Sequence, residues 1–309
     1  MRVRWKELAD WLRVGVFAVG LGAIASAGAQ QIAITFDDLP AHGPLPPHET
    51  RVEVAQKVIR ALKAARVPPT YGFVNGIRVQ EDPSTGAVLA AWRAAGNPLG
   101  SHTWSHMNLN QHSLEQFEDD IAKNEPLLKL QMDGKDWHWF RFPYLAEGDT
   151  IEKKMGVRVY LAQHGYQIAG VTMSFADYNW NEPYARCMEK HDWREVSLLE
   201  RSYLQAAGQS ITYYRNLSQI LYGHDIPYVL LMHIGAFDAR MLPRLLAVYK
   251  AHHFKFVSLE DAEKDPFYKY DTDPKLLPGP DMLEGVMAEK HWALPPHPNW
   301  GGDLGNVCK

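Results

Sequence analysis

Two short segments of the sequence carry side chains of the types that bind metal ions. Asp37 and Asp38 directly follow the apolar segment 31–36, and adjacent carboxylates are costly to bury unless a positive charge lies beside them. A metal ion with one carboxylate as ligand and the other as base would explain such a pair. His102 and His106 have the i, i+4 spacing that places both on one face of a helical turn, where they can bind one ion together.

Each of these patterns also has an ordinary interpretation. An aspartate pair after a strand is typical of a solvated turn, and the histidine spacing can arise by chance in a chain with 14 histidines. Two further residues follow apolar segments, Arg141 and His233. The guanidinium of an arginine can hold a carboxylate through two hydrogen bonds. By themselves, however, Arg141 is typical of a surface arginine before a turn and His233 of a core histidine.

The elements that must position these residues alternate along the chain. Hydrophobic periodicity predicts strands over 31–36, 70–74, 99–102, 137–142, 167–172, 228–232 and 254–259. It predicts helices over 49–65, 85–95, 114–130, 151–164 and 240–252, with one or two helices within 194–222. Such alternation favours a parallel α/β sheet or barrel.

All four groups of polar residues come where a predicted strand ends. Ligands gather at the carboxyl ends of parallel strands, so these groups are expected to converge. One aspartate and the two histidines would make a three-ligand metal site with a position left for water. The other aspartate, the arginine and the last histidine would supply a base, the residue that orients it, and an acid.

Composition and charge narrow the class of protein. Hydrophobic side chains make up 46% and charged side chains 22% of 309 residues, which excludes a disordered chain. A net charge of −4 and a pI near 6.4 provide no basic field for nucleic acid. Two cysteines are too few for a disulfide scaffold.

Three regions are expected along the chain. Residues 1–29 combine a positive start, an apolar stretch and an Ala-Gly-Ala site, the pattern of a signal peptide. An uncleaved anchor is the alternative. The catalytic domain is expected over 30–263, and the proline-rich residues 264–309 are expected to form an irregular tail packed on it. We therefore expect a periplasmic or secreted protein with no stable membrane insertion after cleavage of the leader.

The ordered motifs TFDD, SHTWSH, RFPY and LMH resemble those of the polysaccharide deacetylase family, the NodB-homology or carbohydrate esterase family 4 enzymes, over about residues 32–259. This resemblance implies a distorted, incomplete (β/α) barrel. It also implies one divalent metal ion, usually zinc and sometimes cobalt or nickel, and hydrolysis of N-acetyl or O-acetyl groups on sugar units.

The resemblance assigns roles to the residues that match the motifs. It makes Asp38, His102 and His106 the metal ligands and Asp37 the general base.

The same resemblance covers the later motifs. It implies that Arg141 orients and restrains the base, that the backbone N–H of Tyr144 helps to hold the oxyanion, and that His233 is the general acid.

One motif departs from the family pattern. The family commonly has D-x-x-D-W, which gives an aromatic wall and a carboxylate that tunes the acid histidine. This chain has Asp177, Tyr178, Asn179 and Trp180 in succession. Trp180 is therefore expected to form the wall and Asp177 to tune the histidine from a shifted position. Asn179 stands where the carboxylate usually lies, so the pH optimum stays open.

Cys187 and Cys308 could form a disulfide in an oxidising compartment. Such a bridge would close a loop of about 120 residues and anchor the tail near the active-site rim. Two separate thiols are the alternative.

These observations together predict a metal-dependent hydrolase that removes N-acetyl groups from a peptidoglycan- or chitin-type polysaccharide or oligosaccharide. An O-acetyl polysaccharide esterase would have the same metal site. A non-catalytic, exported carbohydrate-binding protein is the alternative from another class. The acetylated glycan is the expected partner, and the sequence leaves the particular glycan and the oligomeric state open.

Overall fold

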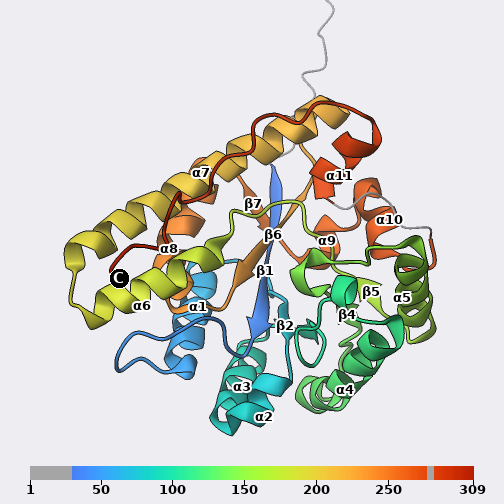
Figure 1. Ribbon diagram of the computed structural model, residues 1–309, viewed down its shortest axis with the longest axis horizontal. Coiled ribbons are helices and arrows are strands. Elements are labelled where there is room, and N and C mark those ends of the chain that lie inside the picture. Colours follow the sequence, from blue (N-terminus) through green and yellow to red (C-terminus); the bar gives the residue numbers. More distant parts are fainter. Residues whose placement is uncertain (1–29, 277–281) are drawn as a thin grey trace, which may run out of the picture.

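The computed structural model describes residues 30–276 and 282–309, so the predicted leader lies outside the described residues. An open, curled sheet of seven parallel strands forms its centre (Figure 1). The strand order is β5-β4-β3-β2-β1-β6, and β7 pairs with the start of β1. The strands span Gln31–Leu39 (β1), Gly72–Val74 (β2), Leu99–Ser101 (β3), Trp139–Phe140 (β4), Gln167–Ile168 (β5), Tyr228–His233 (β6) and Lys255–Val257 (β7). The prediction of an incomplete (β/α) barrel is confirmed.

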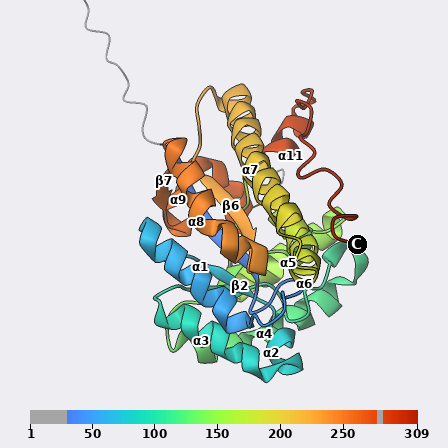
Figure 2. The same ribbon diagram turned by 90° about the vertical axis from the view of Figure 1, so that its left-hand side faces the viewer.

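Helices surround this sheet (Figures 1 and 2). The longer helices are Arg51–Ala65 (α1), Gly86–Ala94 (α3), Leu114–Met132 (α4), Ile151–Gln163 (α5), Asn181–Glu189 (α6), Trp193–Tyr222 (α7), Ala236–Ala251 (α8) and Met282–Glu289 (α11). Short helices span Ile77–Glu81 (α2), Leu259–Ala262 (α9) and Lys269–Thr272 (α10). Single 3-10 turns span Pro83–Thr85, Leu109–Gln111, Pro143–Leu145, Asp177–Trp180 and Pro266–Tyr268.

Local sequence signals account for several of these boundaries. Thr50 begins α1 as part of a capping box, since its side chain accepts from the backbone N–H of Glu53 and the Glu53 carboxylate accepts from that of Thr50. The segment 194–222 is a single helix, α7, which ends at Gly223 in the left-handed conformation that glycine adopts freely. The helix α6, by contrast, was not predicted.

The two sides of the sheet are packed differently. On one side, a large apolar cluster joins the strands to α1, α3, α7 and α8, with Phe36 and Trp92 among its fully buried members. A smaller cluster packs beneath α4 and α5 on the same side. The opposite side of the sheet carries a third cluster, which includes Phe73 and Trp139. At Gly100 in β3, a Cβ atom would lie 2.6 Å from the carbonyl oxygen of Trp139, so only glycine lets β3 approach β4 so closely.

The chain after residue 264 lies along the body of the fold. It is less irregular than predicted, because α11 forms and packs against α7. Beyond α11 the chain runs beside α7 towards α6 (Figure 1). There a disulfide joins Cys308 to Cys187 in α6, and the guanidinium of Arg186 donates to the carbonyl oxygen of Val307 at 2.9 Å.

Candidate active site

The carboxyl ends of β1, β3, β4 and β6 bring the four sequence motifs together. Asp37 and Asp38 lie in the last part of β1, beside His233 at the end of β6, and the register pairs Asp37 with His233. His102 follows β3 directly, and Arg141 follows β4. The sheet therefore gathers residues that lie almost 200 positions apart in the sequence.

Three side chains face one another at separations that suit a metal ion. Oδ1 of Asp38 lies 3.3 Å from Nε2 of His106 and 3.6 Å from Nε2 of His102. Tetrahedral ligands at about 2.0–2.1 Å from zinc are about 3.3–3.4 Å from one another. This oxygen is also buried without a hydrogen-bond partner among the described residues. The donor set thus fits one divalent ion.

The ionisation of these groups agrees with a role as ligands. Burial by itself would raise the pKa of Asp38, but the hydrogen bond from His42 and the nearby histidine charges hold that pKa well below its usual range. Burial, together with the neighbouring His102, lowers the pKa of His106 to about 4. At neutral pH the set therefore contains an ionised carboxylate and a neutral imidazole, the forms that bind metals.

The orientation of His102 is set by its second ring nitrogen. Nδ1 donates to the backbone carbonyl oxygen of Arg141 at 2.7 Å, which leaves Nε2 to face Asp38. Such a bond fixes the tautomer of a metal-binding histidine.

Four residues of the site have a left-handed backbone conformation. Asp38, Thr103, His106 and Tyr144 all have φ between 59° and 62°, a region that costs a non-glycine residue roughly 1–3 kcal/mol. Left-handed residues also occur elsewhere in the chain, for example at Arg66, Asp133 and His253, so this strain accompanies the site but does not by itself locate it.

Asp37 and Arg141 form a buried ion pair behind the metal-binding set. Nη1 of Arg141 lies 3.2 and 3.3 Å from the two carboxylate oxygens of Asp37. The other guanidinium nitrogens donate to the carbonyl oxygens of Ala169 and Gly170 and to the hydroxyl of Thr35. Since its donors are all engaged, the guanidinium is rigid and holds the Asp37 carboxylate in one orientation.

His233 is held by Asp177 through two hydrogen bonds. The backbone N–H of His233 donates to Oδ2 of Asp177 at 2.7 Å, and Nδ1 of the ring lies 3.0 Å from Oδ1. Burial alone would lower the pKa of His233, but the charges of Asp177, Asp38 and Asp37 and the hydrogen bond that the ring donates to Asp177 raise it to about 10. The ring is therefore protonated at neutral pH. The carboxylate contact expected from the D-x-x-D-W position is made by Asp177, two residues earlier than Asn179.

The aromatic wall expected at Trp180 is not there. Trp180 is fully buried, its indole N–H donates to Ser202, and its ring packs on Phe175 and Tyr203. The 3-10 turn at Asp177–Trp180 points Trp180 into the core. Tyr178 instead is 47% exposed, and its ring centroid lies 5.1 Å from that of His233.

Tyr144 lies on the opposite rim of the site. Its side chain is 66% exposed and its ring centroid is 4.5 Å from that of His106. Tyr144 and Tyr178 thus stand beside a candidate metal ligand and beside His233, respectively.

The sequence analysis missed His42. Its Nδ1 lies 2.7 Å from Oδ2 of Asp38, and its ring centroid lies 4.7 Å from that of His233. Asp38, His42 and His233 form a second group whose ligand-type atoms lie within 4.8 Å of one another. The signal in the sequence was the i, i+4 spacing of His42 from Asp38, the same spacing that drew attention to His102 and His106.

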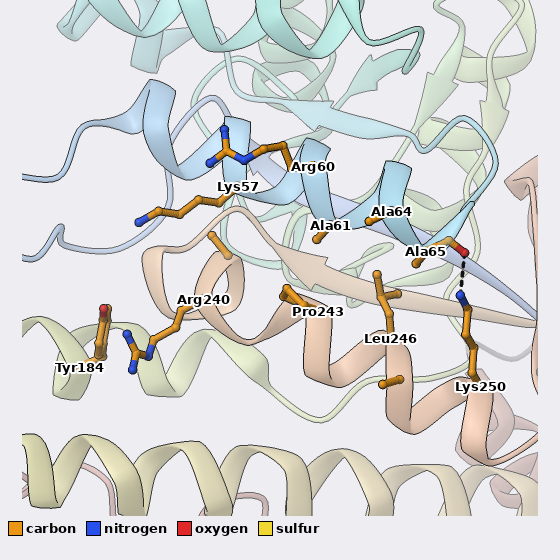
Figure 3. A pocket seen from close by; sticks show the side chains of 12 residues that line it. Lys57, Arg60, Ala61, Ala64, Ala65, Tyr184, Arg240, Pro243, Leu246 and Lys250 are labelled. Carbon is orange, nitrogen blue, oxygen red and sulfur yellow. Dashed lines mark hydrogen bonds between the residues drawn. The ribbon is translucent and has the colours of Figure 1, made fainter.

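A separate groove lies elsewhere on the surface, away from this site. About 610 Å³ lies between α1 and α8, with alanines on its floor and Lys57, Arg60, Arg240 and Lys250 around it (Figure 3). Lys250 donates to the carbonyl oxygen of Ala65 at 2.8 Å. None of the strand-end residues lines this groove, so the volume of a hollow does not locate the chemistry here.

The first half of the chain matches a known protein-family model. Residues 25–169 match the model described as polysaccharide deacetylase.

Curated relatives match part of the chain. It is 27% identical over 36% of its length to a chitin deacetylase of Arthroderma benhamiae, 26% over 40% to a peptidoglycan-N-acetylglucosamine deacetylase of Bacillus cereus, and 30% over 42% to the peptidoglycan-N-acetylmuramic acid deacetylase PdaC of Bacillus subtilis. The matches span 28%, 39% and 25% of those proteins.

Solved structures share the fold at low sequence identity. A CE4 family pseudoenzyme from Bacillus anthracis superimposes with a TM-score of 0.54 and 16% identity, over 76% of this chain and 66% of that chain. A mutant described as a CE4 family pseudoenzyme with restored enzymatic activity gives 0.53, 16%, 76% and 68% for the same measures.

Proposed function

This chain carries a domain of the polysaccharide deacetylase family, and from that premise we propose that it is a metal-dependent hydrolase that removes N-acetyl groups from a polysaccharide or oligosaccharide of chitin or peptidoglycan type. One observation carries the proposal. The Asp37 carboxylate and the His233 ring lie on neighbouring strands, beside a buried oxygen of Asp38 that has no hydrogen-bond partner among the described residues.

Asp38, His102 and His106 would hold the ion. A divalent ion bound there would supply Lewis acidity and lower the pKa of water, and zinc is the ion that best suits this set of ligands. Cobalt or nickel are the other ions proposed.

Asp37 is proposed to accept the proton of the attacking water. Arg141 holds the Asp37 carboxylate in one orientation, since the guanidinium contacts both of its oxygens. The backbone N–H of Tyr144 is proposed to donate to the oxyanion that forms on the acetyl carbonyl.

His233 is proposed to donate a proton to the departing amine. An amine is a poor leaving group, so the reaction needs an acid on the side away from the base. Asp177 supports this role because its charge keeps the His233 ring protonated at neutral pH. Tyr178 takes over the proposed role of the wall beside the sugar.

We propose the same three regions as the sequence suggested, namely a leader over 1–29, a catalytic domain over 30–263 and a tail over 264–309. The disulfide between Cys187 and Cys308 supports export to the periplasm or the medium, where such bonds persist. Within the described residues, none of the helices is long and apolar enough to cross a bilayer.

The experiment is an assay of acetate release from chitin oligomers, peptidoglycan and O-acetylated xylan. We expect release from an N-acetylated glycan, abolition by a chelator and recovery on adding zinc. Asp37→Asn serves as the control for contaminating activity. Release from the O-acetylated glycan alone would replace the proposal with an esterase, and binding without release from any of them would indicate a carbohydrate-binding protein.

A further inference from the structure

His42 occupies a fixed position although it lies in the loop between β1 and α1. Nη1 and Nη2 of Arg51 donate to the backbone carbonyl oxygens of His42 and Gly43, at 2.8 and 2.6 Å. The backbone N–H of Ala41 donates to the carbonyl oxygen of Asp38 at 2.9 Å. These bonds hold the backbone on both sides of His42, so its ring is presented to the site rather than to solvent.

The Asp38 carboxylate is divided between two sets of partners. Oδ1 faces the two histidines of the metal-binding set at 3.3 and 3.6 Å. Oδ2 accepts from Nδ1 of His42 at 2.7 Å. A carboxylate that is free to rotate can bind an ion through one oxygen or both, whereas one anchored at Oδ2 offers only Oδ1.

The 2.7 Å distance between Nδ1 of His42 and Oδ2 of Asp38 indicates a hydrogen bond rather than two ligand atoms of one metal ion. It is a normal length for a charge-assisted N–H···O bond. Two ligand atoms of one tetrahedral zinc ion would be about 3.3–3.4 Å apart. Nδ1 of His42 is therefore a hydrogen-bond donor and Oδ2 of Asp38 its acceptor. In this arrangement His42 supports Asp38 and does not itself bind the ion.

We propose that His42 is a positioning residue that anchors the Asp38 carboxylate through Nδ1–H, so that Asp38 binds the metal ion through Oδ1 alone. The inference rests on the proposed function only in taking Asp38 as a metal ligand. Single-oxygen binding by Asp38 keeps a coordination position available for water, as a hydrolytic site requires.

The test measures metal affinity rather than activity. Purified protein is stripped of metal and titrated with zinc in competition with a chromophoric chelator. The variants are His42→Ala, His42→Asn and His42→Gln, with His48→Ala as the matched control, since His48 is an exposed histidine of the same loop. Thermal unfolding of the metal-free proteins checks that each variant is folded.

The three substitutions show whether Nδ1 or Nε2 of His42 is the nitrogen that holds Asp38. In asparagine the amide nitrogen is attached to Cγ, as Nδ1 is in histidine, whereas in glutamine it lies one atom further out, nearer the place of Nε2. We expect His42→Ala to weaken zinc binding about 10–100-fold, the usual effect of losing an outer partner of a ligand. His42→Asn should restore most of the affinity, His42→Gln should not, and His48→Ala should bind as the wild type does.

The outcomes distinguish this inference from the proposed function. Wild-type protein that binds no zinc at all would overturn the metal site and His42 with it. One tight ion in both wild type and His42→Ala would leave the metal site intact and remove the role of His42. Two ions per wild-type chain, falling to one in His42→Ala, would show that His42 is itself a ligand and overturn the inference.

Discussion

The two sides of the candidate active site are built on different principles. The metal side consists of Asp38, His102 and His106, and its supports lie close by, in the β1–α1 loop and at the end of β4. The acid side consists of His233 and Asp177, which are 56 residues apart. Its supports extend through α6 and α7 to the C-terminal tail. The metal side should therefore respond to changes within it, and the acid side to changes far away.

The supports of the acid side can be traced outward from Asp177. Trp180, at the end of the same 3-10 turn, bonds to Ser202 of α7. A Cβ atom at Gly301 of the tail would lie 2.6 Å from the ring of Trp180.

On its other flank, Asn181 accepts from the backbone N–H of Phe237 and donates to Asp238, and both are buried just after His233. The strand end that carries the acid is thus connected to α7, to the C-terminal tail and to the start of α8.

The largest effect on activity is expected when the metal side alone is disrupted. In His102→Ala, acetate release should fall to the assay background, because one of three ligands is missing, while the protein stays folded. Elemental analysis should find no stoichiometric zinc. Zinc retained at one ion per chain in this variant would contradict the assignment of ligands.

The next largest effect is expected at the base. In Asp37→Asn the amide cannot accept a proton from water, so the rate should fall ~10²–10⁴-fold. Zinc content should stay at the wild-type level, which separates Asp37 from the metal side. A rate near that of the wild type would place the base elsewhere.

The role of the acid side should be measurable in the pH dependence of the rate. Removing the charge of Asp177 in Asp177→Asn should move the pKa of His233 from about 10 towards its ordinary value of 6.5. An acid with a lower pKa loses its proton at lower pH, so the alkaline limb of the rate profile should shift down. At pH 8 the protonated fraction, and with it the rate, would fall roughly 30-fold.

The free energy of unfolding should also depend on pH through the pKa of His233. A raised pKa of His233 stabilises the folded chain below about pH 6.5, and this contribution disappears as the pH rises towards 10. Asp177→Asn should thus lose more stability at pH 6 than at pH 10. An unchanged alkaline limb would show that Asp177 does not tune His233.

Removal of the disulfide, which lies far from the site, tests whether the acid side and the metal side respond independently. Cys187 and Cys308 are 121 residues apart, and the chain-entropy model gives about 5 kcal/mol for closing such a loop. The double variant Cys187→Ala/Cys308→Ala should unfold at lower denaturant concentration and lose some rate, because the tail no longer presses on Trp180. Its zinc affinity should not change. An equal loss of zinc affinity would mean that the two sides are not independent.

The smallest effect is expected at the rim. Tyr178→Ala should raise KM a few-fold without changing stability, since its side chain is 47% exposed. Trp180→Ala should instead destabilise the fold by ~3–5 kcal/mol, as truncation of a buried tryptophan does. A KM effect in a folded Trp180→Ala protein, with none in Tyr178→Ala, would restore Trp180 as the wall.

The sequence by itself determined which strand-end residues meet at the candidate active site. Apolar strands with polar residues at their ends predict a parallel sheet, and in such a sheet those ends must converge. This is why Asp37, Asp38, His102, Arg141 and His233 could be placed together from the sequence although they span β1 to β6.

Tertiary structure alone decided the rest. Whether Tyr178 or Trp180 faces the site depends on the turn at Asp177–Trp180, which no periodic pattern encodes. The position of His42 depends on Arg51, nine residues away, and the pairing of Cys187 with Cys308 depends on the path of the tail beside α7. Contacts of these kinds arise from packing between segments, so the types and spacing of the residues do not specify them.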